Sequence, residues 1–405
     1  MNTDVLIIGA GPSGTASAAI LRKEGFNVTI VEKTTFPRFV IGESLLPRCM
    51  DLLEETGLLE SIKVQDYKEK HGAKFYRGED SCEFNFSEQF TKGKTWTWQV
   101  PRADFDKVLA DEVEKKGATI LYNTSVEDVA FNKDSVVTTI KSKSGIQTIT
   151  SKYIIDGSGY GRVLPNLLDL NIPSTLPVRS AFFTHVDDTN RSEDIESSRI
   201  QVIVLKSDVW VWIIPFSNGK TSLGVVGDLS FIDKTKTNDE NFRTLLASNE
   251  FLSTRFGKNK FEFEPKVIDG YSAGIKQLYG DRYVLTGNST EFLDPIFSSG
   301  VTFALESGVL AAKLIVKELN NETVNWEEEY SEYILKGVAV FRSYVDRWYD
   351  ETLQTVFFSN DIDQDIKGQI CSVLAGYVWD DANPFIKKHK RIVQTLAKVI
   401  EIKKG

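Results

Sequence analysis

The segment DVLIIGAGPSG (residues 4–14) constrains the fold more than any other part of the chain. A short apolar run ends in the pattern Gly9-x-Gly11-x-x-Gly14, an alanine-rich stretch follows, and a second apolar run, NVTIVEK, comes next. This order predicts a strand, a tight turn, a helix and a second strand, as in a Rossmann-like domain. Gly9 permits the turn, Gly11 lets the backbone approach a pyrophosphate, and Gly14 lets the helix pack closely on the strand.

The same segment predicts a dinucleotide site. Free N–H groups at a helix start bind anionic phosphates, and we expect Pro12 and Ser13 to lie at this position. Glu32 ends the second apolar run, where a carboxylate binds ribose hydroxyls, and Lys33 follows it. The alternative is a glycine-rich turn without a ligand.

Three later segments distinguish between dinucleotides. Segment 95–129 predicts a helix that starts with Arg102 and Asp106, then a strand that leads to Val126. Segment 153–162 is an apolar strand that ends in Asp156-Gly157. Segment 281–315 predicts a strand, a turn at Gly287, a loop with Pro295 and a long helix that opens at Gly300. In this order, residues 1 to about 320 resemble the FAD-dependent oxidoreductases of the aromatic-hydroxylase superfamily.

This resemblance implies FAD as the cofactor and an α/β fold with a discontinuous FAD-binding domain (1–75, 100–185 and 270–325). It also implies an inserted mixed β-sheet domain for substrate (76–99 and 186–269) and a helical C-terminal region (326–405). The polar stretch 187–198 is expected to be an exposed loop. The residues expected to contact FAD are Gly9, Gly11, Pro12, Ser13, Gly14, Glu32, Lys33, Arg38, Ser44, Arg102, Val126, Asp156, Gly157, Gly287, Asn288, Pro295, Gly300 and Val301.

One residue departs from the family pattern. The family has Gly-Asp where this chain has Gly287-Asn288. The asparagine oxygen can still accept a hydrogen bond from a ribityl hydroxyl, but it carries no charge. The helix that opens at Gly300 would place its positive dipole end at the flavin, although it could simply be a buried packing helix.

Three stretches resemble the flavin-dependent halogenases: FPRFVIGESLLP (36–47), WVWIIP (210–215) and DPIFSSGV (294–301), of which the last resembles the phenol and pyrrole type. The resemblance implies that backbone N–H groups at Ser299 and Gly300 bind a halide beside the flavin. It further implies that reduced FAD, O2 and halide give a hypohalous acid, which passes to Lys70 for halogenation of an electron-rich aromatic ring. The alternative for Lys70 is a solvated lysine, because its neighbourhood is charged.

The resemblance also assigns a wall between flavin and substrate to Trp210, Trp212, Pro215 and Phe297. Trp210 and Trp212 should point to the same face of one strand, because side chains alternate along strands. Ordinary core packing is the alternative for the two indoles. Phe297 stands where tryptophan halogenases carry a glutamate, so free tryptophan is not the expected substrate.

Composition excludes several classes of function. The net charge of −9 argues against a nucleic-acid partner. With three histidines and three scattered cysteines, no metal site is expected, and a reducing cytoplasm fits. No apolar run is long enough to predict a membrane span.

Other flavin enzymes remain open. A flavin monooxygenase or a reductase resembling geranylgeranyl reductase would act directly on a small aromatic or apolar substrate. A flavoprotein that regulates a partner through its redox state is the third alternative. Only one glycine-rich nucleotide turn is present, so we expect no tight NADPH site and a separate flavin reductase.

Overall fold

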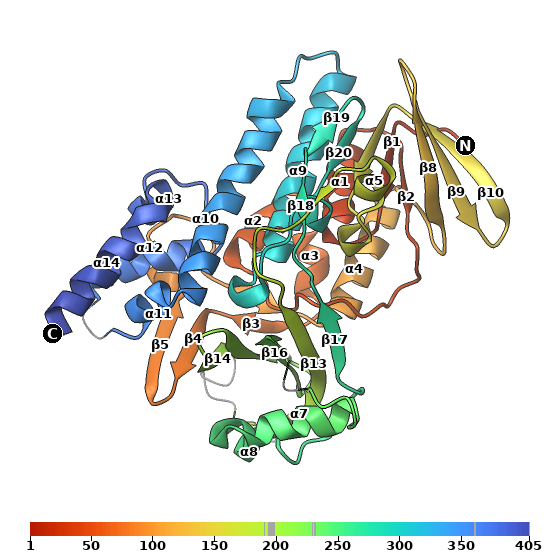
Figure 1. Cartoon of the computed structure of the whole chain (residues 1–405). Coiled ribbons are helices and arrows are strands. Elements are labelled where there is room, and N and C mark those ends of the chain that lie inside the picture. The colour runs from red at the N-terminus through yellow and green to blue at the C-terminus, as the bar shows by residue number, and fades with distance from the viewer. Residues whose placement is uncertain (190, 193–198, 229, 231, 360–361, 405) are drawn as a thin grey trace. The chain divides into compact units, whose positions relative to one another are not determined.

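The structure is a computed structural model that describes residues 1–189, 191–192, 199–228, 230, 232–359 and 362–404 (Figure 1). Residues 190 and 193–198 of the expected loop 187–198 therefore lie outside the described residues. The chain divides into two compact units. Unit 1 comprises residues 1–66, 101–175 and 273–339, and unit 2 comprises residues 67–100, 176–272 and 340–405.

Unit 1 is built on a mainly parallel sheet with the strand order β19-β20-β11-β1-β2-β7. Its central strands β1 and β2 are fully buried and, apart from Thr29, apolar, which is typical of parallel strands that are covered on both faces. Its strands are β1 (Val5–Ile8), β2 (Val28–Val31), β7 (Thr119–Leu121), β8 (Ser125–Phe131), β9 (Val136–Ser142), β10 (Gly145–Ser151), β11 (Tyr153–Asp156), β12 (Asn171–Ile172), β18 (Gly274–Ile275), β19 (Tyr279–Gly280) and β20 (Tyr283–Leu285). Its helices are α1 (Pro12–Lys23), α2 (Pro47–Glu55), α3 (Leu59–Lys63), α4 (Arg102–Lys115), α5 (Val163–Leu167) and α9 (Gly300–Leu319), with 3₁₀ turns η2 (Gly159–Gly161), η3 (Gly287–Ser289) and η4 (Pro295–Phe297) and the π-helical η5 (Glu327–Glu332).

The predicted strand–turn–helix–strand start is confirmed. β1 pairs in parallel with β2 and with β11, and α1 begins with Pro12, the residue type favoured at the first helical position. Helices α1 and α9 lie side by side (Figure 1). Their backbones nearly touch, because a Cβ atom on Gly308 would lie 2.5 Å from the carbonyl oxygen of Ser13. The hydroxyl of Ser17 donates to the carbonyl of Gly308 at 2.9 Å.

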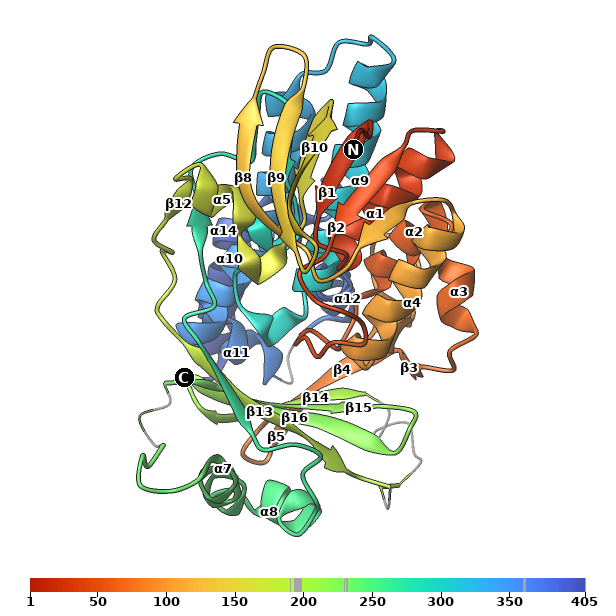
Figure 2. The same cartoon turned by 90° about the vertical axis from the view of Figure 1, so that its right-hand side faces the viewer.

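The polar and apolar alternation around residue 145 predicts a hairpin, and this is also confirmed. β9 and β10 are antiparallel and continue into β8 (Figure 2). Gly145 takes the turn with a φ of 107°, a conformation that residues with a side chain rarely adopt. This small sheet packs on the central sheet through a cluster that includes Leu6, Ile8, Val136, Ile140, Ile149, Ile154, Leu164 and Leu285.

Unit 2 is built on a mixed sheet with the strand order β17-β13-β16-β15-β14-β4-β5, in which only the β14–β4 pair is parallel. Its strands are β3 (Lys68–Lys70), β4 (Gly72–Arg77), β5 (Asp80–Asn85), β6 (Thr97–Gln99), β13 (Ser180–Asp187), β14 (Ile200–Lys206), β15 (Val209–Pro215), β16 (Lys220–Gly227) and β17 (Lys266–Asp269). Its helices are η1 (Phe86–Glu88, 3₁₀), α7 (Asn238–Ala247), α8 (Glu250–Phe256), α11 (Thr352–Phe357), α12 (Gln364–Leu374), α13 (Pro384–Lys387) and α14 (His389–Lys404), together with most of α10 (Tyr333–Tyr349).

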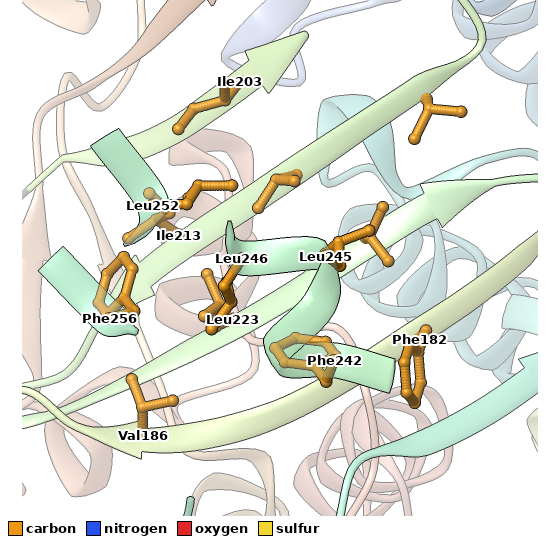
Figure 3. Packing of buried hydrophobic residues seen from close by; sticks show 13 residues of the cluster. Phe182, Val186, Ile203, Ile213, Leu223, Phe242, Leu245, Leu246, Leu252 and Phe256 are labelled. Carbon is orange, nitrogen blue, oxygen red and sulfur yellow. The ribbon is translucent and has the colours of Figure 1, made fainter. Parts of the chain in front are cut away.

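One face of this sheet is covered by α7 and α8 (Figure 2). Phe242, Leu245 and Leu246 of α7 and Leu252 and Phe256 of α8 point at the strands (Figure 3). The strands contribute Phe182, Val186, Ile203, Val211, Ile213, Leu223 and Val225 to the same core. Val211 and Ile213 therefore face these helices, and the residues that alternate with them face the other way.

The opposite face carries the two indoles, which share a face as the sequence predicts. The rings of Trp210 and Trp212 lie 6.1 Å apart, and Trp212 stacks with Phe183 at 6.2 Å. Gly224 leaves the space for the indole of Trp212, because a Cβ atom there would lie 2.2 Å from the ring. Further along this face, Phe75 packs against Trp348 of α10 and Phe357 of α11.

The two units differ from the domains expected from sequence at several boundaries, because residues 67–75, 100, 176–185 and 270–272 lie in unit 2. Lys70, which the sequence assigns to the FAD-binding domain, lies in unit 2. The C-terminal region is split, because residues 326–339 belong to unit 1 and residues 340–405 to unit 2. The division into three functional domains stays a prediction. Within the described residues, no helix is both long enough and apolar enough to cross a bilayer.

We predict that Gly224→Ala destabilises the protein by about 1–3 kcal/mol, because the added methyl group overpacks the site filled by the Trp212 ring. Urea unfolding measures the change, and tryptophan fluorescence should report a displaced indole. Gly161→Ala is the control, because its Cβ would have only ordinary contacts, the nearest at 3.5 Å. Equal stability of the two variants would contradict the packing described here.

Candidate functional site

Three glycines bring the backbone of unit 1 together at the carboxyl ends of β1 and β11. Gly9 has a φ of 92°, and a Cβ atom on it would lie 2.7 Å from the carbonyl oxygen of Gly157. A Cβ atom on Gly14 would lie 2.0 Å from the carbonyl oxygen of Gly9. The N–H of Gly157 donates to the carbonyl of Ile8 at 2.9 Å. No other residue type fits Gly9 or Gly14 without moving the backbone.

The start of α1 has the features of an anion site. No side chain caps the helix, and the N–H groups of Ser13 and Gly14 donate to no acceptor in the described part of the chain. A Cβ atom on Gly11 would lie 3.6 Å from Nη2 of Arg38, its nearest neighbour. Unpaired N–H groups, a helix dipole and a nearby guanidinium fit a diphosphate. The hydroxyl of Ser13 donates to Thr286 at 2.7 Å, so its backbone N–H is the group left for a ligand.

Glu32 lies against this turn and is 5% exposed. Its Oε2 accepts the N–H of Ala10 at 2.9 Å, and its Oε1 accepts the N–H of Thr34 at 3.0 Å and the Thr34 hydroxyl at 2.8 Å. A carboxylate can accept about four hydrogen bonds, so capacity remains for a ribose hydroxyl. Lys33, the next residue, is exposed.

Arg102 fastens the loop that contains Ser44 to helix α4. Its Nε and Nη2 donate to the two oxygens of Asp106 at 2.8 and 3.0 Å, and its Nη1 donates to the carbonyls of Ile41 and Gly42 at 3.0 and 3.3 Å. Burial alone would lower the pKa of Arg102, but the charge of Asp106 and its hydrogen bonds raise the pKa above its ordinary value. The charged form of Arg102 is therefore a fixed part of the site, and Ser44 is buried in the loop that it holds.

Arg38 lies between two carboxylates. Its Nη1 is 3.5 Å from Oδ2 of Asp106, and its Nε is 3.6 Å from Oε1 of Glu32. The guanidinium also lies over the ring of Phe36, 4.9 Å from its centroid. Its Nε is buried and makes no hydrogen bond with the described residues. The Nη2 of this guanidinium lies beside Gly11, where it suits a phosphate oxygen.

The carboxylate of Asp156 accepts three hydrogen bonds from other residues of unit 1. It is fully buried and accepts the N–H of Ser158 at 2.8 Å, the hydroxyl of Ser289 at 2.9 Å and the N–H of Leu164 at 2.6 Å. These bonds tie the end of β11 to the start of α5 and to η3. Asp156 is thus placed to hold the segment that contains Gly157 and the turn at Gly287. A direct contact of Asp156 with FAD stays a prediction.

The turn at Gly287 is held by residues that the sequence does not point to. Gly287 has a φ of 56°, and its N–H donates to the hydroxyl of Ser307 in α9 at 2.8 Å. The carbonyl of Asn288 accepts from Arg162 at 3.0 Å, whereas the side-chain amide of Asn288 makes no hydrogen bond with the described residues. Ser307 lies seven residues into a predicted helix, and nothing in the sequence marks its partner. The amide of Asn288 is available to a ligand.

The start of α9 is a second candidate anion site. Asp294 accepts the N–H of Ile296 at 3.0 Å and Ser298 has a φ of 56°, so the chain turns sharply into the helix. No side chain caps α9, and its first turn contains no acidic residue. The N–H groups that lack an acceptor among the described residues are those of Ser299, Gly300, Val301 and Thr302. Pro295 and the buried Phe297 form η4 just before this turn.

Val126 lies on β8 opposite Ile140, where it packs against the core of unit 1. Its contact with FAD stays a prediction. Among the described residues, no three or more His, Cys, Asp or Glu side chains are arranged to hold a metal ion.

Lys70 is almost completely buried, with 1% of its surface exposed. It ends β3, stands opposite Thr97 of β6, and places its Nζ 5.5 Å from the centre of the Phe86 ring. The expected alternative of a solvated lysine is thus contradicted.

The predicted wall residues belong to both units. Trp210, Trp212 and Pro215 lie on β15 of unit 2, and Phe297 lies in unit 1. The indole N–H of Trp210 donates to the hydroxyl of Tyr349 at 2.9 Å, and that of Trp212 donates to Ser222 at 3.0 Å. Both indoles are therefore held rigidly, and a wall function stays a prediction.

Comparison with known families gives one match that covers most of the chain. The family model described as "FAD binding domain" matches residues 2–283. A 1H-pyrrole-2-carbonyl peptidyl-carrier protein chlorinase of Pseudomonas fluorescens is 28% identical over 372 residues, which cover 86% of this chain and 82% of that protein. A tryptophan 2-halogenase of Chondromyces crocatus is 26% identical over 367 residues and covers 85% of this chain and 68% of that protein.

Solved structures are similar along the whole chain. A flavoprotein/dehydrogenase from Cytophaga hutchinsonii has a TM-score of 0.97 and 51% identity, and each chain is covered completely. A triple mutant of the flavin-dependent brominase Bmp2 has a TM-score of 0.84 and 25% identity, with 96% of this chain and 98% of that chain covered.

We predict that Asp156→Ala lowers the free energy of unfolding by about 3 kcal/mol or more, because three buried donors lose their charged acceptor. Chemical denaturation measures this loss. Asp134→Ala is the control, because Asp134 is 85% exposed and should change stability by less than about 0.5 kcal/mol. An Asp156→Ala protein as stable as this control would show that the carboxylate does not hold the segment.

Proposed function

The chain belongs to the FAD binding domain family, and from this membership and the site we propose that it is a flavin-dependent halogenase of electron-rich aromatic compounds. It is an FAD-dependent enzyme of the oxidoreductase type, and FAD is its cofactor. The curated relatives named for halogenation support the proposed activity. The proposal includes a separate flavin reductase, and a cytoplasmic location stays a prediction.

The burial of Lys70 is the observation that carries the proposal. Lysine is almost never fully buried in proteins unless something compensates its charge, because removing an ammonium from water is costly. Lys70 is 1% exposed, in a segment whose sequence, DYKEKHGAK, suggests a solvated surface, so the fold encloses this side chain at a cost. A flavin enzyme that acts directly on its substrate has no need for such a lysine. A halogenase needs an enclosed ammonium or amine that binds an oxidant away from bulk water.

In this proposal the start of α1 binds the diphosphate of FAD. The N–H groups of Ser13 and Gly14 donate to phosphate oxygens, and Arg38 donates from Nη2, the atom that lies beside Gly11. Glu32 accepts a ribose hydroxyl, and the side chain of Asn288 bonds the ribityl chain. When bound and reduced, FAD would supply the two electrons that activate O2 for oxidation of the halide.

The N–H groups of Ser299, Gly300, Val301 and Thr302 bind the halide. A halide carries a full negative charge and accepts several hydrogen bonds, and an uncapped helix start offers both N–H donors and a positive dipole end. The first turn of α9 contains no acidic residue that would repel the anion.

Lys70 then binds the hypohalous acid and presents its halogen to the substrate. The aromatic ring attacks the halogen, the halogen–oxygen bond breaks, and the ring loses a proton, so that the net products are the halogenated ring and water. The rigidly held indoles of Trp210 and Trp212 favour a flat aromatic substrate. Phe297 in place of a glutamate favours a phenol or a pyrrole over free tryptophan.

A single-turnover experiment tests the proposed function. The protein is loaded with chemically reduced FAD and mixed with O2, bromide and a phenol or pyrrole probe. The proposal predicts a brominated product. A hydroxylated product without bromination would instead identify a monooxygenase. Flavin oxidation without any product would favour a regulatory flavoprotein, and rapid reduction of the bound flavin by NADPH alone would contradict the need for a separate reductase.

We predict that Lys70→Met lowers bromination by at least about 100-fold while the rate of flavin oxidation is unchanged, because the side chain keeps its length but loses its ammonium. Product yield per oxidised flavin is the measurement. Lys68→Met is the matched control, because Lys68 lies on the same strand and is only half-buried. If both variants brominate like the wild type, Lys70 has no catalytic role.

We predict that Ser299→Asp raises the KM for bromide by at least about tenfold, because a carboxylate at the start of α9 competes for the same N–H groups. The melting temperature should stay equal or rise, because aspartate is favourable at a helix start. Ser299→Ala is the control and should leave the KM for bromide within about threefold, since the N–H groups remain. An unchanged KM in Ser299→Asp would place the halide elsewhere.

A further inference from the structure

Thr97 stands directly opposite Lys70 in the antiparallel ladder of β3 and β6. Side chains that are directly opposite in such a ladder point to the same face, with Cβ atoms about 5 Å apart. Lys70 is the last residue of β3 and Thr97 the first of β6, so the pair forms one end of this short ladder. The two side chains are therefore neighbours on one face of the ladder.

The hydroxyl of Thr97 has no hydrogen-bond partner among the described residues, although Thr97 is completely buried. A hydroxyl can donate one hydrogen bond and accept two, and a buried polar group without a partner is destabilising. Valine has nearly the same shape, suits a strand equally well and carries no such penalty. The hydroxyl at this position is therefore available to a partner that is not part of the protein, and unlike the hydroxyl of Thr138, equally unpartnered within the described part of the chain, it lies beside a buried lysine.

An aromatic ring lies beside this pair of side chains. Nζ of Lys70 lies over the ring of Phe86, which is itself 1% exposed. The electron-rich ring face attracts an ammonium but offers neither a donor nor an acceptor to a small polar molecule. A small polar molecule bound at Lys70 can therefore take a second hydrogen bond at Thr97 but none from Phe86.

We propose that Thr97 is a second binding residue of the Lys70 site and that its hydroxyl orients the hypohalous acid. This inference rests on the proposed function. The ammonium of Lys70 donates to the oxygen of the acid, and the hydroxyl of Thr97 accepts its O–H. Two hydrogen bonds fix the direction of the oxygen–halogen bond, whereas one bond leaves it free to rotate. Thr97 thereby decides which ring position of an aromatic substrate meets the halogen.

The test compares wild type, Thr97→Val and Thr97→Ser in the single-turnover reaction with bromide and phenol. Product per oxidised flavin, the ratio of ortho to para bromophenol and the hypobromite released to a trapping agent are measured. Thr138→Val is the matched control, because Thr138 is also completely buried with an unpartnered hydroxyl, but lies on β9 in unit 1. Melting temperatures of all variants are recorded.

We expect Thr97→Val to lose about tenfold in product per oxidised flavin, to release more hypobromite and to change the isomer ratio, since one orienting hydrogen bond is gone. Its melting temperature should equal or exceed that of the wild type, which a merely structural hydroxyl would not explain. Thr97→Ser and Thr138→Val should keep the wild-type yield and isomer ratio. A Thr97→Val protein with the wild-type yield and ratio overturns the inference alone, whereas a wild type that forms no bromophenol overturns the proposed function and the inference with it.

Discussion

Backbone contact between glycines determines the geometry of unit 1. Gly9, Gly14 and Gly157 approach one another so closely that a single added carbon at Gly14 would lie 2.0 Å from a carbonyl oxygen. Gly308 extends the same contact from α1 to α9, where a Cβ atom would lie 2.5 Å from Ser13. Because these contacts involve backbone atoms, a change of side-chain conformation cannot relieve the clash that a larger residue would cause. The positions of β1, β11, α1 and α9 relative to one another are therefore narrowly defined.

The two helices that these contacts hold together, α1 and α9, both start without a side-chain cap. Each carries unpaired N–H groups and the equivalent of about half a positive charge. Gly308 is eight residues after Gly300, which corresponds to about 12 Å along α9. The contact with Ser13 thus fixes how far the start of α9 reaches beyond α1. One start suits a diphosphate, and the other suits the negative charge of a reduced flavin or a halide.

Local patterns were sufficient to predict the parts of the site that depend on neighbours in the sequence. The glycine motif, the helix that opens at Gly300 and the shared face of Trp210 and Trp212 all follow from spacing. Contacts between distant residues could not be predicted this way. The carboxylate of Asp156 accepts hydrogen bonds from Ser158, Ser289 and Leu164, and the distant partner Ser289 carries no sequence signal, while the contact of Asp156 with FAD stays a prediction.

Lys70 also shows that local patterns do not predict contacts between distant residues. Its charged neighbours favour a solvated surface, yet pairing with β6, almost thirty residues later, buries it opposite Thr97. The unpartnered hydroxyl of Thr97 could not be recognised from the sequence, because threonine is common in strands. The resemblance to halogenases points to Lys70, and the structure adds that this lysine is buried.

The central claim is that two uncapped helix starts in one unit hold the diphosphate of FAD and the halide. A crystal of the protein with FAD and bromide, measured at the bromine absorption edge, tests it most directly. The account predicts an anomalous bromide peak within hydrogen-bonding distance of the N–H groups of Ser299 to Thr302 and a diphosphate at Ser13 and Gly14. Bromide bound only elsewhere, with the start of α9 in contact with neither halide nor flavin, would contradict it.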